Sequence, residues 1–163
     1  MSDTDTNSDF RTDDLTGCVP DIVLRPVTRH RVMDALERAG IAYTVDVDRE
    51  VSGRWENGCI WFDRAGKDNA VLSVTGYWKG WLPEDRRTEL LETCNDWNER
   101  MLYPHAYVST DDDGDLHVVG HHAVDCTFGV TDEQLYQHID SAAAVMRCLF
   151  GDLTEQYPKG VPD

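Results

Sequence analysis

Three segments of the chain place apolar residues three or four positions apart, which is the spacing of one face of an α-helix. The last segment has the strongest start signal, because Thr131 and Gln134 can form a capping box. In the first segment, Thr28 is suited to cap the helix and Gly40 to end it. The pattern therefore predicts helices over about residues 28–39, 83–101 and 131–150, the last of them stopped by Gly151.

Other segments alternate apolar and polar residues, or form short runs rich in β-branched and aromatic side chains, as strands do. Turn residues such as Asn57-Gly58 and Asp113-Gly114 stand between them. Strands joined by short turns pair antiparallel, because parallel neighbours need a long crossover. The predicted strands are residues 41–47, 59–63, 70–78, 105–110 and 116–126.

The predicted order of elements is α-β-β-β-α-β-β-α. Each helix has one apolar stripe and the sheet needs one face covered, so we expect an α+β fold in which helices pack against an antiparallel sheet. Residues 20–157 have the length of a single domain. The acidic residues 1–19 are expected to be a disordered N-terminal tail, and residues 158–163 a C-terminal loop.

The charge of the chain limits its partners. The formal net charge is −16 and the sequence pI is about 4.5, so an electrostatic grip on nucleic acid or on an anionic membrane is not expected. The start of the sequence has no secretory signal pattern, and no apolar run is long enough to span a bilayer. Five scattered cysteines without a Cys-x-x-Cys pair indicate reduced thiols. We therefore expect a cytoplasmic protein.

Histidines are the main candidate for metal chemistry, since the aspartate run at residues 111–115 does not match a calcium-binding loop. His105, His117 and His121 fall on two strands that form a predicted hairpin, and converging imidazoles would suit zinc. However, His121 and His122 must point to opposite faces of a strand. The sequence also has no P-loop, nucleophile elbow or glycine-rich dinucleotide motif. We predict no metal site, no cofactor and no catalytic residue, and hence a protein that is not an enzyme.

Aromatic residues gather in Tyr77, Trp78 and Trp81, at the end of the strand predicted for residues 70–78. Two tryptophan rings beside a loop cannot easily both be buried, and exposed aromatic rings mark partner surfaces. These three residues are therefore the predicted partner-binding site. The alternative is that they cover the edge of the second helix. The other tryptophans, Trp55, Trp61 and Trp97, are expected in the core.

A short motif lies near the end of the second helix, where Asn95-Asp96-Trp97-Asn98 is followed by a strand that begins near His105. This N-x-W-N segment and the order of elements, over about residues 22–155, resemble the YbjN-like family of bacterial sensory transduction regulators. The acidic leader and the histidine-rich last strand have no counterpart in the family pattern. Independently of the resemblance, Asn98 is suited to bond the backbone of the following loop, which would make the motif structural.

The resemblance implies a fold similar to type III secretion chaperones, no catalytic residues, and a cytoplasmic regulatory or protein-binding role. It implies a homodimer by analogy only. The leading hypothesis is thus a non-catalytic, chaperone-like protein-interaction module whose partner is unknown. The competing hypothesis is a small-molecule-binding protein or hydrolytic enzyme, with a cleft near Trp78 or near the strands of His105, His117 and His121.

Overall fold

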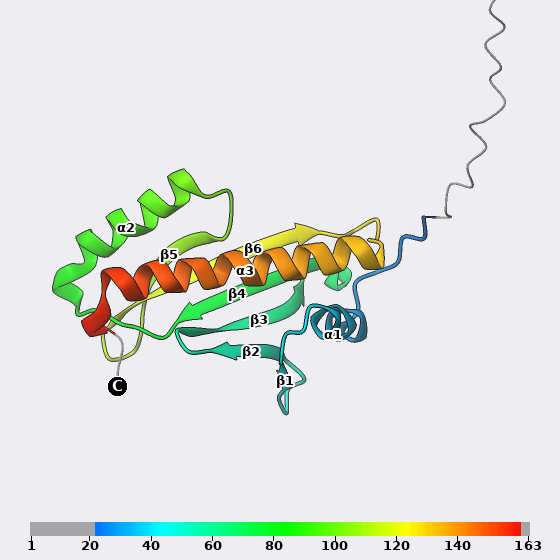
Figure 1. The fold of residues 1–163 in the computed structure, drawn as a ribbon, viewed down its shortest axis with the longest axis horizontal. Coiled ribbons are helices and arrows are strands. Elements are labelled where there is room, and N and C mark those ends of the chain that lie inside the picture. The colour runs from blue at the N-terminus through cyan, green and yellow to red at the C-terminus, as the bar shows by residue number, and fades with distance from the viewer. Residues whose placement is uncertain (1–21, 161–163) are drawn as a thin grey trace, which may run out of the picture.

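The computed structural model describes residues 22–160, which form three α-helices and six strands (Figure 1). The helices are α1 (Arg29–Arg38), α2 (Arg87–Arg100) and α3 (Asp132–Gln156). The strands are β1 (Thr44–Val45), β2 (Val51–Trp55), β3 (Gly58–Ala65), β4 (Val71–Trp78), β5 (His105–Thr110) and β6 (Leu116–Asp125). The tail predicted for residues 1–19 lies outside the described residues, as do residues 161–163. Within the predicted C-terminal loop, Pro158–Gly160 forms a short 3-10 helix.

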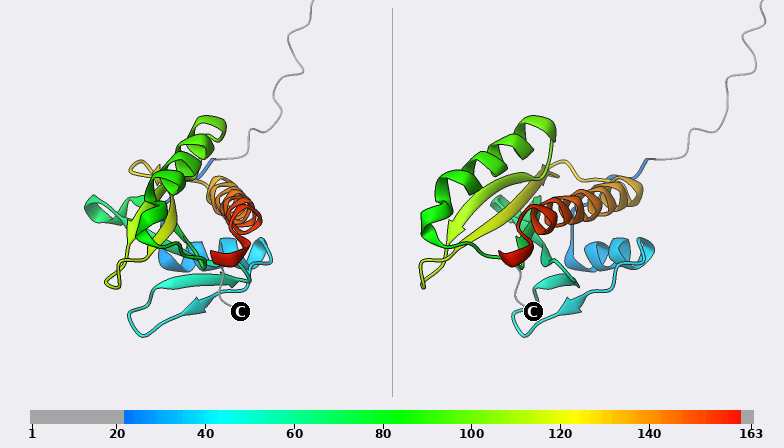
Figure 2. Two further views of the ribbon diagram at one scale, coloured as in Figure 1. Left: turned by 90° about the vertical axis from the view of Figure 1, so that its left-hand side faces the viewer. Right: turned by 60° about the vertical axis from the view of Figure 1, so that its left-hand side comes forward.

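All six strands form one antiparallel sheet in the order β1-β2-β3-β4-β6-β5. The long helix α3 runs across one face of this sheet, as Figure 1 and the side view in Figure 2 show. Helix α1 packs on α3, and α2 packs along β5. The predicted fold class, an α+β fold with helices on an antiparallel sheet, is confirmed.

The core lies between the sheet and α3. Strand residues that point to the helices are almost inaccessible to solvent; among them are Ile60, Phe62, Leu72, Val74, Leu116 and Val118. Helix α3 contributes the matching apolar stripe, which includes Leu135, Ile139, Ala142, Met146, Leu149, Phe150 and Leu153. Burial of this stripe fixes α3 on the sheet, since apolar burial is the main favourable term in folding.

Two strand glycines bring α3 close to the middle of the sheet. Gly76 of β4 and Gly120 of β6 are directly opposite in the ladder. A Cβ atom at Gly76 would lie 2.4 Å from both Cγ and Sδ of Met146, and one at Gly120 would lie 2.5 Å from the same sulfur. The absence of side chains at these two positions therefore makes the space that Met146 fills.

The edge of the sheet differs from the prediction. Residues 41–47 were expected to form one strand, but only Thr44–Val45 is a strand, and the chain then turns back into β2, which the pattern missed. The alternation did not reflect burial, because Val45 is 43% exposed and Val47 is 96% exposed. The order is therefore α-β-β-β-β-α-β-β-α, with one strand more than expected.

Helix α3 does not stop at Gly151. It continues to Gln156, with Leu153 and then Tyr157 extending the buried stripe beyond the glycine. Gly151 has no positive φ angle, and a Cβ atom there would meet nothing within 4 Å. Burial of the residues after the glycine thus outweighs its low helix propensity. The start of α3 is as predicted, with the capping box of Thr131 and Gln134 in place.

Candidate functional site

The N-x-W-N motif joins the end of α2 to β5. The indole Nε1 of Trp97 donates a hydrogen bond to the carbonyl of Pro104 at 3.0 Å. The carboxamide of Asn98 donates to the carbonyl of Ala106 at 2.9 Å and accepts from its backbone N–H at 2.8 Å. Asn98 thus pairs with β5 as a neighbouring strand would, and α2 covers part of an open sheet edge. Asn95 is exposed.

Asn98→Ala is expected to lower the free energy of unfolding by about 1–3 kcal/mol, because both backbone groups of Ala106 lose their partner. The matched control is Asn95→Ala, which alters an exposed residue of the same motif and should change stability by less than about 0.5 kcal/mol. Urea denaturation of the three proteins measures both values. Equal stability of the two variants would show that the hydrogen bonds of Asn98 to Ala106 do not stabilise the contact between α2 and β5.

The predicted aromatic cluster is divided between the two faces of the sheet. Trp78 is 2% exposed, and its Nε1 donates to Thr154 Oγ1 of α3 at 3.0 Å. Tyr77, the preceding residue, faces the opposite side and is 44% exposed. Trp81 is 41% exposed, and its backbone N–H bonds to the carbonyl of Gly160. Trp78 is therefore part of the core and is not available to a partner, which corrects the expectation of one exposed cluster.

Tyr77 belongs instead to a row of residues on the face of the sheet that no described helix covers. In the ladder register Tyr77 is opposite Val119, and Val119 is opposite Tyr107. Tyr107 is 43% exposed, whereas Val119 is only 3% exposed because a tyrosine stands on each side of it. Partial burial is the main cause that raises the pKa of Tyr77, with Tyr107 as a further cause.

The outward-facing residues of β3, β4, β6 and β5 that lie nearest to the tyrosine row carry no full charge. We call this surface the open sheet face, and it comprises Cys59, Trp61, Ser73, Thr75, Tyr77, His105, Tyr107, Ser109, His117, Val119, His121 and Ala123. None of these is Asp, Glu, Lys or Arg, but two carboxylates point to the same side of the sheet: Asp63 of β3, directly opposite Ser73, and Asp125 of β6, directly opposite Val71. A depression of about 530 Å³ lies at one side of the face, between Trp61 and Tyr77, and Glu50 and Asp63 also line it. Trp61 was expected in the core, and it lines this depression instead.

The histidines do not converge on one point. His105 and His121 are directly opposite on the open sheet face. His117 Nε2 lies 2.8 Å from Asp111, and this hydrogen bond is the main cause that lowers the pKa of Asp111. His122 faces the helices, where burial lowers its pKa. Among residues 22–160, no group of three or more His, Cys, Asp or Glu side chains is arranged to hold a metal ion.

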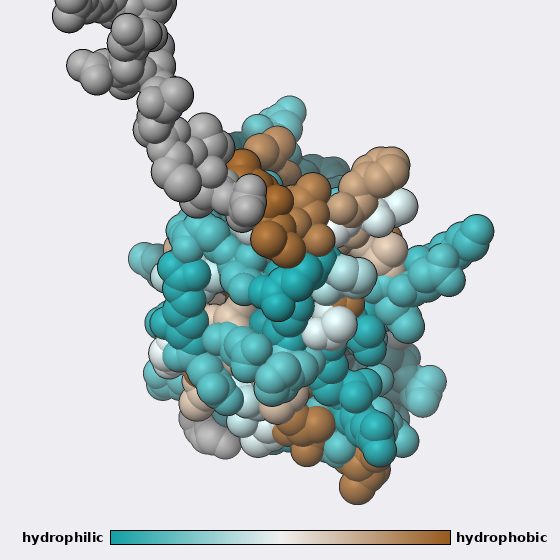
Figure 3. Space-filling view, turned by 90° about the vertical axis from the view of Figure 1, so that its right-hand side faces the viewer, coloured by the Kyte–Doolittle hydropathy of each residue, from teal (hydrophilic) through white to brown (hydrophobic). Residues whose placement is uncertain are grey.

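A second group of exposed apolar side chains lies near residue 22, the first residue that the structure describes. Residues 22–24 are 50–71% exposed and Phe128 is 90% exposed. Figure 3 shows brown apolar side chains gathered beside the grey atoms on this side. Arg25 and Asp132, close to these residues in the chain, form an ion pair, so charge borders this apolar area.

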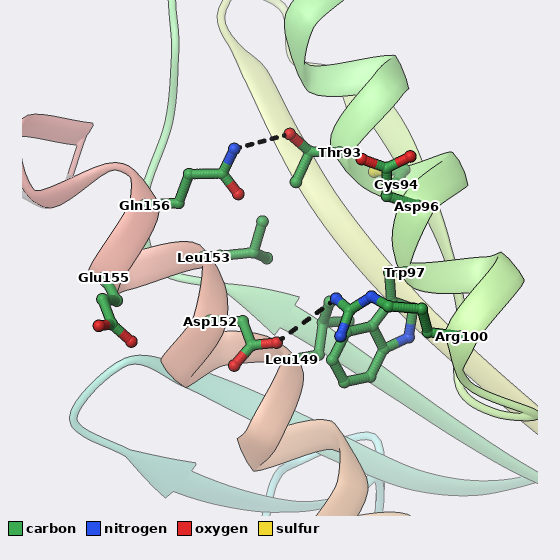
Figure 4. Close-up of a pocket in the computed structure, with 10 residues that line it drawn as sticks. All are labelled: Thr93, Cys94, Asp96, Trp97, Arg100, Leu149, Asp152, Leu153, Glu155 and Gln156. Carbon is green, nitrogen blue, oxygen red and sulfur yellow. Dashed lines mark hydrogen bonds and ion pairs between the residues drawn. The ribbon is translucent and has the colours of Figure 1, made fainter.

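A groove runs between α2 and the C-terminal half of α3, on the helical side of the molecule (Figure 4). Its volume is about 340 Å³. Four lining residues, Cys94, Trp97, Leu149 and Leu153, are each at most 3% exposed and form an apolar floor. Burial raises the pKa of the Cys94 thiol to about 11, so this thiol is not a reactive nucleophile near neutral pH.

The fold and the open sheet face define a small α+β domain in which no helix of residues 22–160 covers one side of the sheet. The sequence model of the YbjN family, described as "Putative bacterial sensory transduction regulator", matches residues 28–155, and the chain belongs to this family. A solved structure of YbjN from E. coli, described as "a putative transcription regulator", is similar, with a TM-score of 0.71 and 12% sequence identity. That similarity covers 82% of this chain and 96% of the E. coli chain.

No curated protein matched the chain. None of the helices within residues 22–160 is both long and apolar enough to cross a membrane. Sequence reasoning singled out Tyr77 but missed Trp61, Val119 and Tyr107. Their alternation along the strands places them opposite the core face, but only the ladder register shows that they lie side by side.

Proposed function

We propose that this protein is a non-catalytic, cytoplasmic regulatory module that acts by binding another polypeptide on its open sheet face. The observation that carries the proposal is the row of Tyr77, Val119 and Tyr107, which contains no charged residue and exposes two tyrosine rings. Tyrosine is enriched among the residues that dominate binding energy, and charge is depleted at the centre of interfaces. The partner surface should accordingly be apolar and carry little charge.

The overall charge of the chain supports this choice of surface. The net charge is −16, so a partner that covers most parts of the surface must remove carboxylates from water. This loss of solvation is unfavourable. The row of Tyr77, Val119 and Tyr107 contains no carboxylate, so a partner that covers this row avoids that cost. Burying the exposed half of each tyrosine ring contributes about 1 kcal/mol in return.

The family description supports regulation, and E. coli YbjN is described as "a putative transcription regulator". The charge of the present chain favours a protein partner over direct contact with DNA, because phosphate contacts need lysine and arginine side chains. A chaperone-like action would be of the same kind, since it too requires an apolar surface that binds a polypeptide.

The test compares affinity capture by four baits: the wild type, Tyr77→Lys, Tyr107→Lys and the control Leu102→Lys. Leu102 is 95% exposed in the loop between α2 and β5 and is not one of the strand residues that form the open sheet face. A true partner should be captured equally by the wild type and the control, and about tenfold or more weakly by the two face variants. Thermal denaturation checks that all four proteins are folded.

The captured polypeptide is then purified and its affinity for each bait measured. Equal affinity for all four baits would contradict a binding role for the open sheet face. Light scattering shows whether the partner is a second copy of this chain, in which case the face variants become monomeric and Leu102→Lys does not.

A further inference from the structure

The rim of the groove between α2 and α3 carries an excess of negative charge. Asp96 lies on the α2 side, and Asp152 and Glu155 lie on the α3 side (Figure 4). Arg100 is the only lysine or arginine among the residues that line the groove. Three carboxylates and one guanidinium therefore surround an apolar floor, and this combination suits a ligand that is both apolar and cationic.

The position of Arg100 indicates which kind of ligand group the groove can bind. Its Nη2 lies 3.8 Å from Asp152 Oδ2, and its guanidinium carbon lies 5.9 Å from the centre of the Trp97 ring. The first distance is too long for a hydrogen bond, and the second is near the limit for a cation–π contact. The side chain of Arg100 is 63% exposed. The chain thus holds its own cation loosely over the aromatic floor, and another cation can displace it.

The two ends of the groove are closed differently. At the end near the chain terminus, Gln156 Nε2 donates to Thr93 Oγ1 at 3.2 Å, and Thr93 Oγ1 lies 2.7 Å from the hydroxyl of Tyr157. At the other end only the long Arg100–Asp152 contact spans the two helices. An incoming side chain therefore enters most easily at the Arg100 end.

We propose that this groove binds a basic segment of a partner polypeptide. An arginine or lysine of the partner takes the place of Arg100 beside Asp152 and over Trp97, and a neighbouring apolar side chain packs into the cavity near Leu149 and Leu153. The site is distinct from the open sheet face, because it lies between the helices on the other side of the sheet. It would let one molecule hold two polypeptides at once.

The test measures fluorescence anisotropy of a labelled amphipathic peptide of leucine and lysine with the full chain. The groove variant is Asp96→Asn with Asp152→Asn, and we expect its affinity for the peptide to fall about tenfold. The control, Asp48→Asn with Asp112→Asn, removes the same charge from two exposed turns and should change affinity less than about twofold. Equal losses in the two variants would show attraction by net charge alone and would overturn the proposal.

A second comparison tests the displacement of Arg100. Arg100→Ala should bind the same peptide more tightly than the wild type, because the competing cation is gone. Its affinity should be about threefold higher than that of a control variant that loses the same charge outside the groove. The matched control is Arg147→Ala, whose guanidinium carbon also lies 5.9 Å from a tryptophan ring, that of Trp55, outside the groove. Equal affinities of these two variants, or no measurable binding by the wild type, would overturn the proposal. Lysine substitution of Tyr77 should leave peptide affinity unchanged, which separates this test from that of the open sheet face.

Discussion

Gly76→Val is expected to destabilise the protein by about 3 kcal/mol, although valine has a higher strand propensity than glycine. The reason is steric. A Cβ atom at this position would lie 2.4 Å from Cγ and Sδ of Met146 and 2.9 Å from Cζ of Phe150. The valine methyl groups add to that overlap, so α3 must move away from the sheet or Met146 must leave its rotamer. Urea denaturation of the variant and the wild type measures the loss.

Two controls isolate the steric cause. Gly151→Ala adds a methyl group on helix α3, at a position where nothing lies within 4 Å. It should stabilise the protein by about 0.5–1 kcal/mol. Gly76→Val combined with Met146→Ala should be less destabilised than the sum of the two single variants, since the truncation removes the clashing atoms. Strict additivity of those two changes would rule out Met146 as the source of the effect.

The sequence alone predicted correctly those elements that depend on contacts between residues close together in the chain. Thr131 and Gln134 define the start of α3 through hydrogen bonds within one turn, and Thr28 caps α1 in the same way. Short turns between strands were enough to predict an antiparallel sheet. These features require no knowledge of distant parts of the chain.

The predictions that were wrong concern elements whose structure depends on contacts between residues far apart in the sequence. Gly151 is a good helix stop by itself, but burial of Leu153 and Tyr157 carries the helix past it. Trp78 is adjacent to a loop, yet its indole is buried because Thr154 accepts its N–H across the fold. The strand β2 was missed because its partners, β1 and β3, define it more than its own residues do.

The candidate site was predictable only in part for the same reason. The sequence placed Tyr77 on a strand and predicted the β5–β6 hairpin, but the row with Val119 and Tyr107 also requires β4 to pair with β6, and these two strands are not consecutive in the chain. The lack of charged residues in this row is likewise visible only once the strands are paired. No single strand reveals it, since each one carries charged or polar residues elsewhere.

Trp97→Ala is expected to destabilise the protein by about 3–5 kcal/mol, the largest loss among the motif residues. Trp97 is 3% exposed, so its removal leaves a cavity between α2 and α3, and the carbonyl of Pro104 also loses the indole N–H as its donor. Trp97→Phe keeps much of the packing and should lose only about 1–3 kcal/mol, mostly from the missing hydrogen bond.

The control for this prediction is Trp81→Ala, which removes the same side chain from a position that is 41% exposed. Its loss should be well below that of Trp97→Ala, because much of the Trp81 ring is already in water. Urea denaturation gives all three values. If Trp97→Ala were no more destabilised than Trp81→Ala, the tryptophan of the N-x-W-N motif would have no structural role, and its place in the floor of the groove would become its main significance.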